Sequence, residues 1–131
     1  MKRLFFFIAL VMTFSLVSCK DKSVSEEVTV ISVEEVRNAM GNGEFQLIDV
    51  RTVEEFNEGH LKGAKNVCVT DDDFKEKVAK LDRNEPVYLY CRSGRRSARA
   101  GEILREMGFT EIYDMDGGIL KWNEEDFELE K

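Results

Sequence analysis

The sequence predicts a small α/β domain in which a parallel sheet of about five strands carries helices on both faces. Two patterns indicate this fold class: short apolar segments alternate with helical ones, and turn residues separate them. The length of 131 residues, less a removable N-terminal segment, allows one hydrophobic core. Parallel sheets place their sites at the carboxyl ends of the strands, so residues at those ends are the candidates for a functional site.

Short apolar or β-branched runs, bounded by polar and turn residues, predict the strands. The run Val87–Tyr90 is the most apolar of them, and Pro86 introduces it. The five predicted strands cover residues 28–31, 47–50, 66–69, 87–90 and 112–114.

Capping boxes and glycines predict where the first helices begin and end. Ser32 opens one capping box and Thr52 opens another, and the helices that follow end near Gly41 and at Gly59. Two further helices are predicted over residues 71–81, with an acidic cap, and 97–107, closed by Gly108, and a short terminal helix contains Trp122.

The first eighteen residues have the features of a lipoprotein signal peptide. Lys2 and Arg3 precede an apolar run of about thirteen residues, which is short for a membrane span of about 30 Å. The run ends in Leu16-Val17-Ser18-Cys19, which resembles a bacterial lipobox. We therefore predict a signal peptide over 1–18, a lipidated Cys19 with a polar tether over 19–27, and one domain over 28–131. A secretory signal with an incidental cysteine, or an uncleaved anchor, is the alternative.

This N-terminus predicts an extracytoplasmic protein, lipid-anchored to a bacterial membrane on its periplasmic or outer-membrane side. Without Lys2 and Arg3 the chain has 17 basic and 26 acidic residues, a balance that disfavours nucleic acid as a partner. Four of the nine arginines nevertheless fall within residues 92–99. This cluster predicts a local site for a small anion.

The most informative segment begins at Cys91, which leaves an apolar strand and precedes a glycine-containing loop and a helix. In such a loop the backbone N–H groups turn inward, and the helix adds its positive end. These surroundings lower a thiol pKa from about 8.5 to roughly 3.5–7.5, so we expect Cys91 to be a thiolate at neutral pH. Gly94 allows the tight turn and Ser97 is a suitable N-cap. Arg92 and Arg96 can bind an anionic substrate.

The loop Cys91-Arg92-Ser93-Gly94-Arg95-Arg96, with Ser97 after it, resembles the six-residue active-site loop of the rhodanese family. The other matching blocks are Asp49-Val50-Arg51, Glu55-Phe56, Gly59-His60-Leu61, Gly63-Ala64 and Asn66-Val67 upstream, and Gly117-Gly118-Ile119 with Trp122 downstream. The resemblance implies a rhodanese-like fold and a sulfurtransferase without a cofactor. Cys91 would take sulfane sulfur from an anionic donor such as thiosulfate, hold it as a persulfide, and pass it to cyanide or a thiol.

The length of the loop distinguishes sulfurtransferases from phosphatases of similar fold. Four residues lie between Cys91 and Arg96, whereas phosphatases of similar fold use one more, so the length favours sulfur over phosphate. Arg92, directly after the cysteine, looks more like thiosulfate-using than mercaptopyruvate-using members. A cysteine phosphatase or arsenate reductase, a persulfide carrier for a protein acceptor, and a partner-binding module remain the alternatives.

For the remaining candidate residues, a structural role is weighed against a catalytic or redox role. Cys68 lies between apolar residues, which favours packing over a resolving thiol. His60 resembles the family's structural histidine, which is favoured over a base for Cys91. Asp49 and Arg51 are expected to pair and to brace the loops. The cysteine spacing fits no zinc pattern and the single histidine cannot complete one, so no metal is expected.

Overall fold

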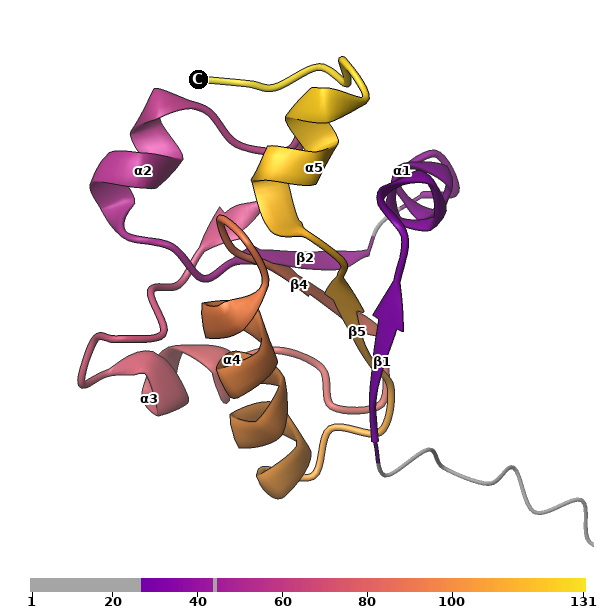
Figure 1. Ribbon diagram of the computed structural model, residues 1–131. Helices are drawn as coiled ribbons and strands as arrows, with labels where there is room; N and C mark the ends of the chain where they lie inside the picture. Colours follow the sequence, from indigo (N-terminus) through magenta and orange to yellow (C-terminus); the bar gives the residue numbers. More distant parts are fainter. Residues whose placement is uncertain (1–26, 44) are drawn as a thin grey trace, which may run out of the picture.

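The fold is an open sheet of five parallel strands in the order β1-β5-β4-β2-β3, seen in a computed structural model (Figure 1). The structure describes residues 27–43 and 45–131. The strands are β1 (Val28–Ile31), β2 (Gln46–Asp49), β3 (Lys65–Asn66), β4 (Val87–Tyr90) and β5 (Ile112–Met115). The predicted fold class is confirmed. The predicted signal peptide and Cys19 lie outside the described residues.

Helices cover both faces of the sheet (Figure 1). They are α1 (Val33–Met40), α2 (Val53–Glu58), α3 (Phe74–Val78), α4 (Arg95–Glu106) and α5 (Gly118–Glu124). One core joins the sheet to α3 and α4, and its buried residues include Phe74, Leu89 and Leu104. The other joins it to α1 and α5 through Val36 and Trp122. Within the described residues, no helix is long and apolar enough to cross a membrane.

Both predicted capping boxes form, because their bonds link residues only three apart. The Ser32 hydroxyl accepts from the Glu35 amide at 3.1 Å, and the Glu35 carboxylate accepts from the Ser32 amide at 2.8 Å. Thr52 and Glu55 repeat the exchange at 3.3 and 3.0 Å. Each box satisfies amides that the first helical turn leaves without partners.

The prediction of a capped helix over 71–81 is wrong in extent. The helix is only Phe74–Val78, and the carboxylate of Asp73 does not cap it but pairs with Lys77 at 3.0 Å. Phe74 and Val78 are nevertheless buried in the core, as predicted. The predicted strand over 66–69 is likewise shorter, although the amide of Val69 still bonds to the carbonyl of Val50.

The prediction of Ser97 as an N-cap is also wrong. The helix begins at Arg95, and its N-cap is Gly94, whose φ of 112° lies in the left-handed region that favours glycine. Ser97 is therefore inside the first turn, where its side chain is fully buried.

The strand order determines where a site can form. β4 lies between β5 and β2, and the chain leaves β2 toward one edge of the sheet and β4 toward the other. The helices that follow, α2 and α4, lie on opposite faces (Figure 1). Ligands of open α/β sheets bind at such a switch point, outside the carboxyl ends of the strands. Cys91 directly follows β4 at this point.

Candidate active site

Cys91 lies between the end of the central strand and the start of α4. Its side chain belongs to the core on the α4 side, and the residue is 1% exposed. The next two residues, Arg92 and Ser93, are exposed, and Gly94 turns the chain into α4. The sulfur is thus held at the base of a short loop whose rim faces solvent.

The loop carbonyls are held by α5. The amide of Ile119 donates to the carbonyl of Cys91 at 2.9 Å, and that of Leu120 donates to the carbonyl of Arg92 at 3.1 Å. In a trans peptide the N–H points opposite to the C=O, so the amide of Ser93 is directed away from α5. The amide of Gly94 donates to Cys91 Sγ at 3.0 Å. Fixing the carbonyls on one side therefore turns the amides toward the sulfur.

These contacts change the acidity of Cys91. Burial by itself raises the pKa of the thiol, because it disfavours the charged form. Hydrogen bonds from the hydroxyl and amide of Ser97 and from the amides of Gly94 and Ser93 outweigh it, and the pKa of Cys91 is lowered overall. The predicted thiolate thus has a structural basis in the loop amides and in Ser97.

Arg96 is already engaged by a carboxylate. Its guanidinium makes two hydrogen bonds with Glu55 of α2, at 2.7 and 2.8 Å. These bonds are the main reason that the pKa of Glu55 falls to about 2 and that the pKa of Arg96 rises, and the negative charge of Cys91 adds a smaller increase for Arg96. Arg96 therefore braces the loop against α2 and adds positive charge near the sulfur, and any donor anion would share it with Glu55. Its role as an anion ligand stays a prediction.

Asp49 and Arg51 form a buried ion pair, the arrangement expected from the sequence. Arg51 Nη2 lies 2.6 Å from Asp49 Oδ2 and also donates to the carbonyl of Gly59 at 2.7 Å. The side-chain amide of Asn66 donates to the carbonyls of both residues. The pair ties the ends of β2, α2 and β3 together, so it supports the wall of the site.

His60 is oriented by contacts that do not include Cys91. Its Nδ1 lies 3.0 Å from the carbonyl of Phe56, and its ring stacks on the Phe56 ring at 3.8 Å. Its Nε2 faces Glu130 at 3.8 Å. Both ring nitrogens thus have neighbours outside the loop, which favours the structural interpretation over that of a base.

The sequence patterns do not predict the roles of two residues at the site. Gly118, in a block noted only for its resemblance, has a φ of 61°, and a Cβ there would overlap the carbonyls of Cys91 and Arg92. Asp114 is predicted only as a strand residue, yet it is a buried acid whose pKa is affected by Ser97. The sequence signal was an acid at an inward-facing position of an apolar strand.

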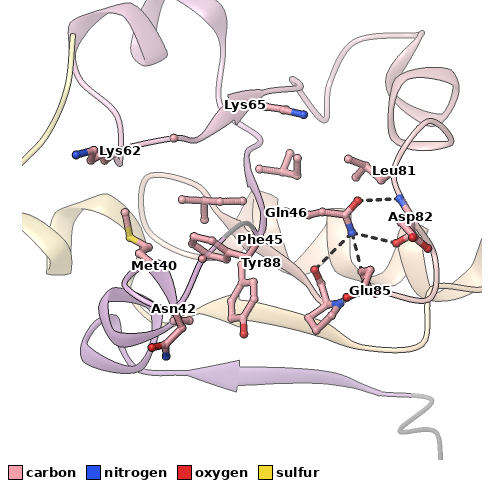
Figure 2. Close-up of a pocket in the computed structure, with 16 residues that line it drawn as sticks. Met40, Asn42, Phe45, Gln46, Lys62, Lys65, Leu81, Asp82, Glu85 and Tyr88 are labelled. Carbon is pink, nitrogen blue, oxygen red and sulfur yellow. Dashed lines mark hydrogen bonds between the residues drawn. The ribbon is translucent and has the colours of Figure 1, made fainter.

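A large groove lies away from this site. It has a volume of about 990 Å³ and is lined by the beginning of β2, the end of α1 and the segments around residues 62–65 and 81–88. Figure 2 shows Gln46 among the residues that line it. The Gln46 side chain bonds to the backbone of Asp82 at 2.7 and 3.0 Å and to the carbonyls of Glu85 and Pro86. No residue of the Cys91 loop lines this groove, so it is not part of the candidate site.

Comparisons with known proteins place these features in a family. The family model described as a rhodanese-like domain matches residues 32–125. The uncharacterized protein YqhL of Bacillus subtilis is 44% identical over 82 residues, which cover 63% of this chain and 64% of that protein. The thiosulfate sulfurtransferase GlpE of Shewanella oneidensis is 33% identical over 79 residues, covering 60% and 76%. The thiosulfate sulfurtransferase PspE of Escherichia coli is 40% identical over 72 residues, covering 53% and 67%.

Solved structures share the fold. A rhodanese-related protein from Thermoplasma volcanium has a TM-score of 0.69 and 26% identity, over 78% of this chain and 97% of that one. A rhodanese-like domain protein from Staphylococcus aureus has a TM-score of 0.68 and 28% identity, over 79% and 100%.

Proposed function

This chain belongs to the rhodanese-like domain family, and from that membership we propose that it is a sulfurtransferase that carries sulfane sulfur on Cys91 as a persulfide. The observation that carries the proposal is the set of loop amides and the Ser97 hydroxyl around Cys91 Sγ, which lower the pKa of the thiol. A thiolate is the form that attacks sulfur. Similarity to proteins named thiosulfate sulfurtransferase supports the same reaction.

The reaction needs only the chemistry of the thiolate. Cys91 attacks the outer sulfur of thiosulfate, a new S–S bond forms, and the old S–S bond breaks with its electron pair leaving on sulfite. The persulfide then places its negative charge one atom beyond Sγ. An acceptor such as cyanide or a thiol attacks that outer sulfur, and Cys91 returns as a thiolate.

An anionic donor suits the charges at the rim of the loop. Arg92 and Arg95 are exposed there, and Arg96 is partly buried and bound to Glu55. Guanidinium groups donate in a planar arrangement that matches sulfonate and carboxylate oxygens. The six-residue loop favours the small outer sulfur of thiosulfate over a phosphate group. The acceptor is a small thiol, cyanide or a protein thiol.

Mass spectrometry of the intact protein after incubation with thiosulfate tests the proposal. We expect the intact mass to rise by one sulfur atom, peptide mapping to place that atom on the peptide that contains Cys91, and cyanide to remove it. Turnover of a phosphoester at equal concentration is the comparison, because a cysteine phosphatase would use the same residue. Phosphoester turnover that depends on Cys91 and exceeds sulfur transfer would contradict the proposal.

Cys68 is proposed to pack rather than to react. Its side chain is 7% exposed, and its Sγ lies 3.1 Å from the Thr70 hydroxyl. Cys68→Ala should lower the free energy of unfolding by less than about 2 kcal/mol and preserve sulfur transfer, because it removes one small buried group. Urea denaturation and a thiosulfate assay measure the two effects. Loss of turnover with stability intact would make Cys68 a resolving thiol.

The membrane anchor is the second part of the proposal, and it depends on Cys19. Lipid chains on this residue would contribute about 0.8 kcal/mol for each buried methylene, enough together to hold the domain at a membrane surface. Cys19→Ser should leave the domain folded and move it from the membrane fraction to the soluble fraction after cell lysis. If the variant stays with the membranes, an uncleaved apolar segment is the better explanation.

A further inference from the structure

Asp114 is a buried acid whose carboxyl group is only partly satisfied. It lies in β5 opposite Leu89 of β4, and the residue is 5% exposed. Ile112, two residues earlier in the strand, packs in the core on the α4 side, so Asp114 faces the same layer as Cys91. Among the described residues, Asp114 Oδ1 has no hydrogen-bond partner. A buried polar atom without a partner costs stability, so this position is unusual for packing alone.

Ser97 connects this acid to the active-site sulfur. It is fully buried in the first turn of α4, and its hydroxyl lies close enough to Cys91 and to Asp114 to lower the pKa of each. In the structure this hydroxyl donates to the carbonyl of Gly94 at 3.2 Å. A hydroxyl carries a single hydrogen. The sulfur, the carboxyl group and the Gly94 carbonyl therefore compete for it.

We propose that Cys91 and Asp114 share the hydrogen of the Ser97 hydroxyl, so that Asp114 controls how strongly the site stabilises the Cys91 thiolate. When Asp114 is protonated, it donates to Ser97 Oγ, and Ser97 donates its own hydrogen to the sulfur. When Asp114 is ionised, it accepts the Ser97 hydrogen, and the thiolate loses that bond. Asp114 is thus a positioning residue that acts through Ser97.

The acidity of Asp114 makes this competition relevant near neutral pH. Burial raises the pKa of its carboxyl group from 3.8 to about 6, with a smaller contribution from the charge of Asp116, although the Ser97 bond lowers it. The pKa of the Cys91 thiol is lowered as well. Two groups that share one hydrogen titrate as a coupled pair.

Other charged groups near the pair are engaged elsewhere. β1 carries no titratable side chain, and the tyrosines of β4 pack in the core on the opposite face. On the β5 side, Asp116 is exposed and pairs with Lys121 at 2.8 Å. From α4, Arg96 interacts with Cys91 but is bound to Glu55. The shared hydroxyl is therefore the direct link between the acid and the sulfur.

The experiment measures the ionisation of Cys91 in Asp114→Asn, which keeps the shape of the side chain and removes its charge. The rate of iodoacetamide alkylation, followed on the peptide that contains Cys91, reports the thiolate fraction as a function of pH. We expect alkylation of the variant to be about three- to tenfold faster at about pH 6.5, because a fall of one pKa unit raises that fraction up to tenfold. The alkylation rate of the variant, plotted against pH, should also follow the titration of the Cys91 thiol alone. An unchanged profile in a folded variant would overturn the proposal.

Two matched variants separate hydrogen sharing from charge alone. In a Ser97→Ala background, Asp114→Asn should change the alkylation rate much less than in the native chain, and an effect of equal size would overturn the sharing. Asp116→Asn removes the neighbouring exposed carboxylate and should alter the rate less than twofold. A change as large as that of Asp114→Asn would also contradict the proposal. The test concerns thiol ionisation and does not depend on which substrate Cys91 attacks.

Stability provides an independent measurement of the same acid. Because folding raises the pKa of Asp114 from 3.8 to about 6, the folded chain binds more protons than the unfolded chain in this window. The native protein should therefore lose stability as the pH rises from about 4 to about 7, and Asp114→Asn should lose less. Parallel stability curves for the two proteins would show that Asp114 does not titrate in this range and would overturn the proposal.

Discussion

Cys91→Ser should abolish both persulfide formation and the transfer of sulfur from thiosulfate to cyanide. The substitution changes one atom, so the loop and its amides should keep their positions. A serine hydroxyl is not ionised at neutral pH and forms no persulfide, so the loss should reach the background of the assay. Intact-protein mass after incubation with thiosulfate, and thiocyanate formation with cyanide present, are the two measurements.

Cys68→Ser is the matched control for this prediction, because it makes the same atomic change at a second buried cysteine. It should retain sulfur loading. If Cys91→Ser still took up sulfur, or if Cys68→Ser failed to take up sulfur at equal stability, Cys91 would not be the residue that carries the sulfur.

Gly118→Ala should be the most damaging change outside the cysteine itself. At a φ of 61°, any side chain costs about 1–2 kcal/mol. The added Cβ would also lie 2.5 Å from the carbonyl oxygen of Cys91 and closer to that of Arg92, so the backbone must shift. We expect the free energy of unfolding to fall by about 3–5 kcal/mol, at the upper end for single substitutions. Urea denaturation measures this loss.

The same substitution should reduce the stabilisation of the Cys91 thiolate and so raise the pKa of the thiol. The carbonyls that the Cβ displaces are the ones bonded to Ile119 and Leu120, and their position directs the loop amides toward the sulfur. Alkylation of Cys91 at neutral pH should therefore slow in whatever fraction remains folded.

Gly63→Ala is the control, because Gly63 has a φ of 76° but, apart from its chain neighbours, no atom lies within 4 Å of the place that a Cβ would take. Its free energy of unfolding should fall only by the conformational cost of a side chain at positive φ, about 1–2 kcal/mol. Equal losses at Gly63 and Gly118 would show that the close approach of α5 to the loop is not what requires glycine.

Short-range features of the fold were predictable from the sequence. The capping boxes at Ser32 and Thr52 formed as expected, since their bonds join residues three apart. The strands 28–31 and 87–90 coincide with β1 and β4, because their β-branched, aromatic and apolar residues favour extended backbone. The ends of α3 and α4 were not predictable in this way. Asp73 found a partner in Lys77, and Gly94 rather than Ser97 preceded α4.

In the candidate site, too, the features set by neighbouring residues were predictable, and those set by distant residues were not. The place of Cys91 at the end of an apolar strand, before a glycine-containing loop, could be inferred from neighbouring residues. The binding of Arg96 by Glu55 could not, because the two residues are 41 positions apart and meet only when α2 and α4 flank the sheet. The sequence suggested a free cation for the substrate, whereas the structure gives it a carboxylate partner.

By itself the sequence determined the order of strands and helices, the cysteine proposed as reactive and the length of its loop, because these depend on residues close together in the chain. Tertiary structure decided what surrounds the sulfur. Only the packing of α5 against the loop fixes the carbonyl of Arg92 and makes glycine necessary at 118. Only the pairing of β5 with β4, under α4, brings Asp114 to Ser97. Such contacts form between distant segments and are set by the geometry of the whole sheet, so no local pattern encodes them.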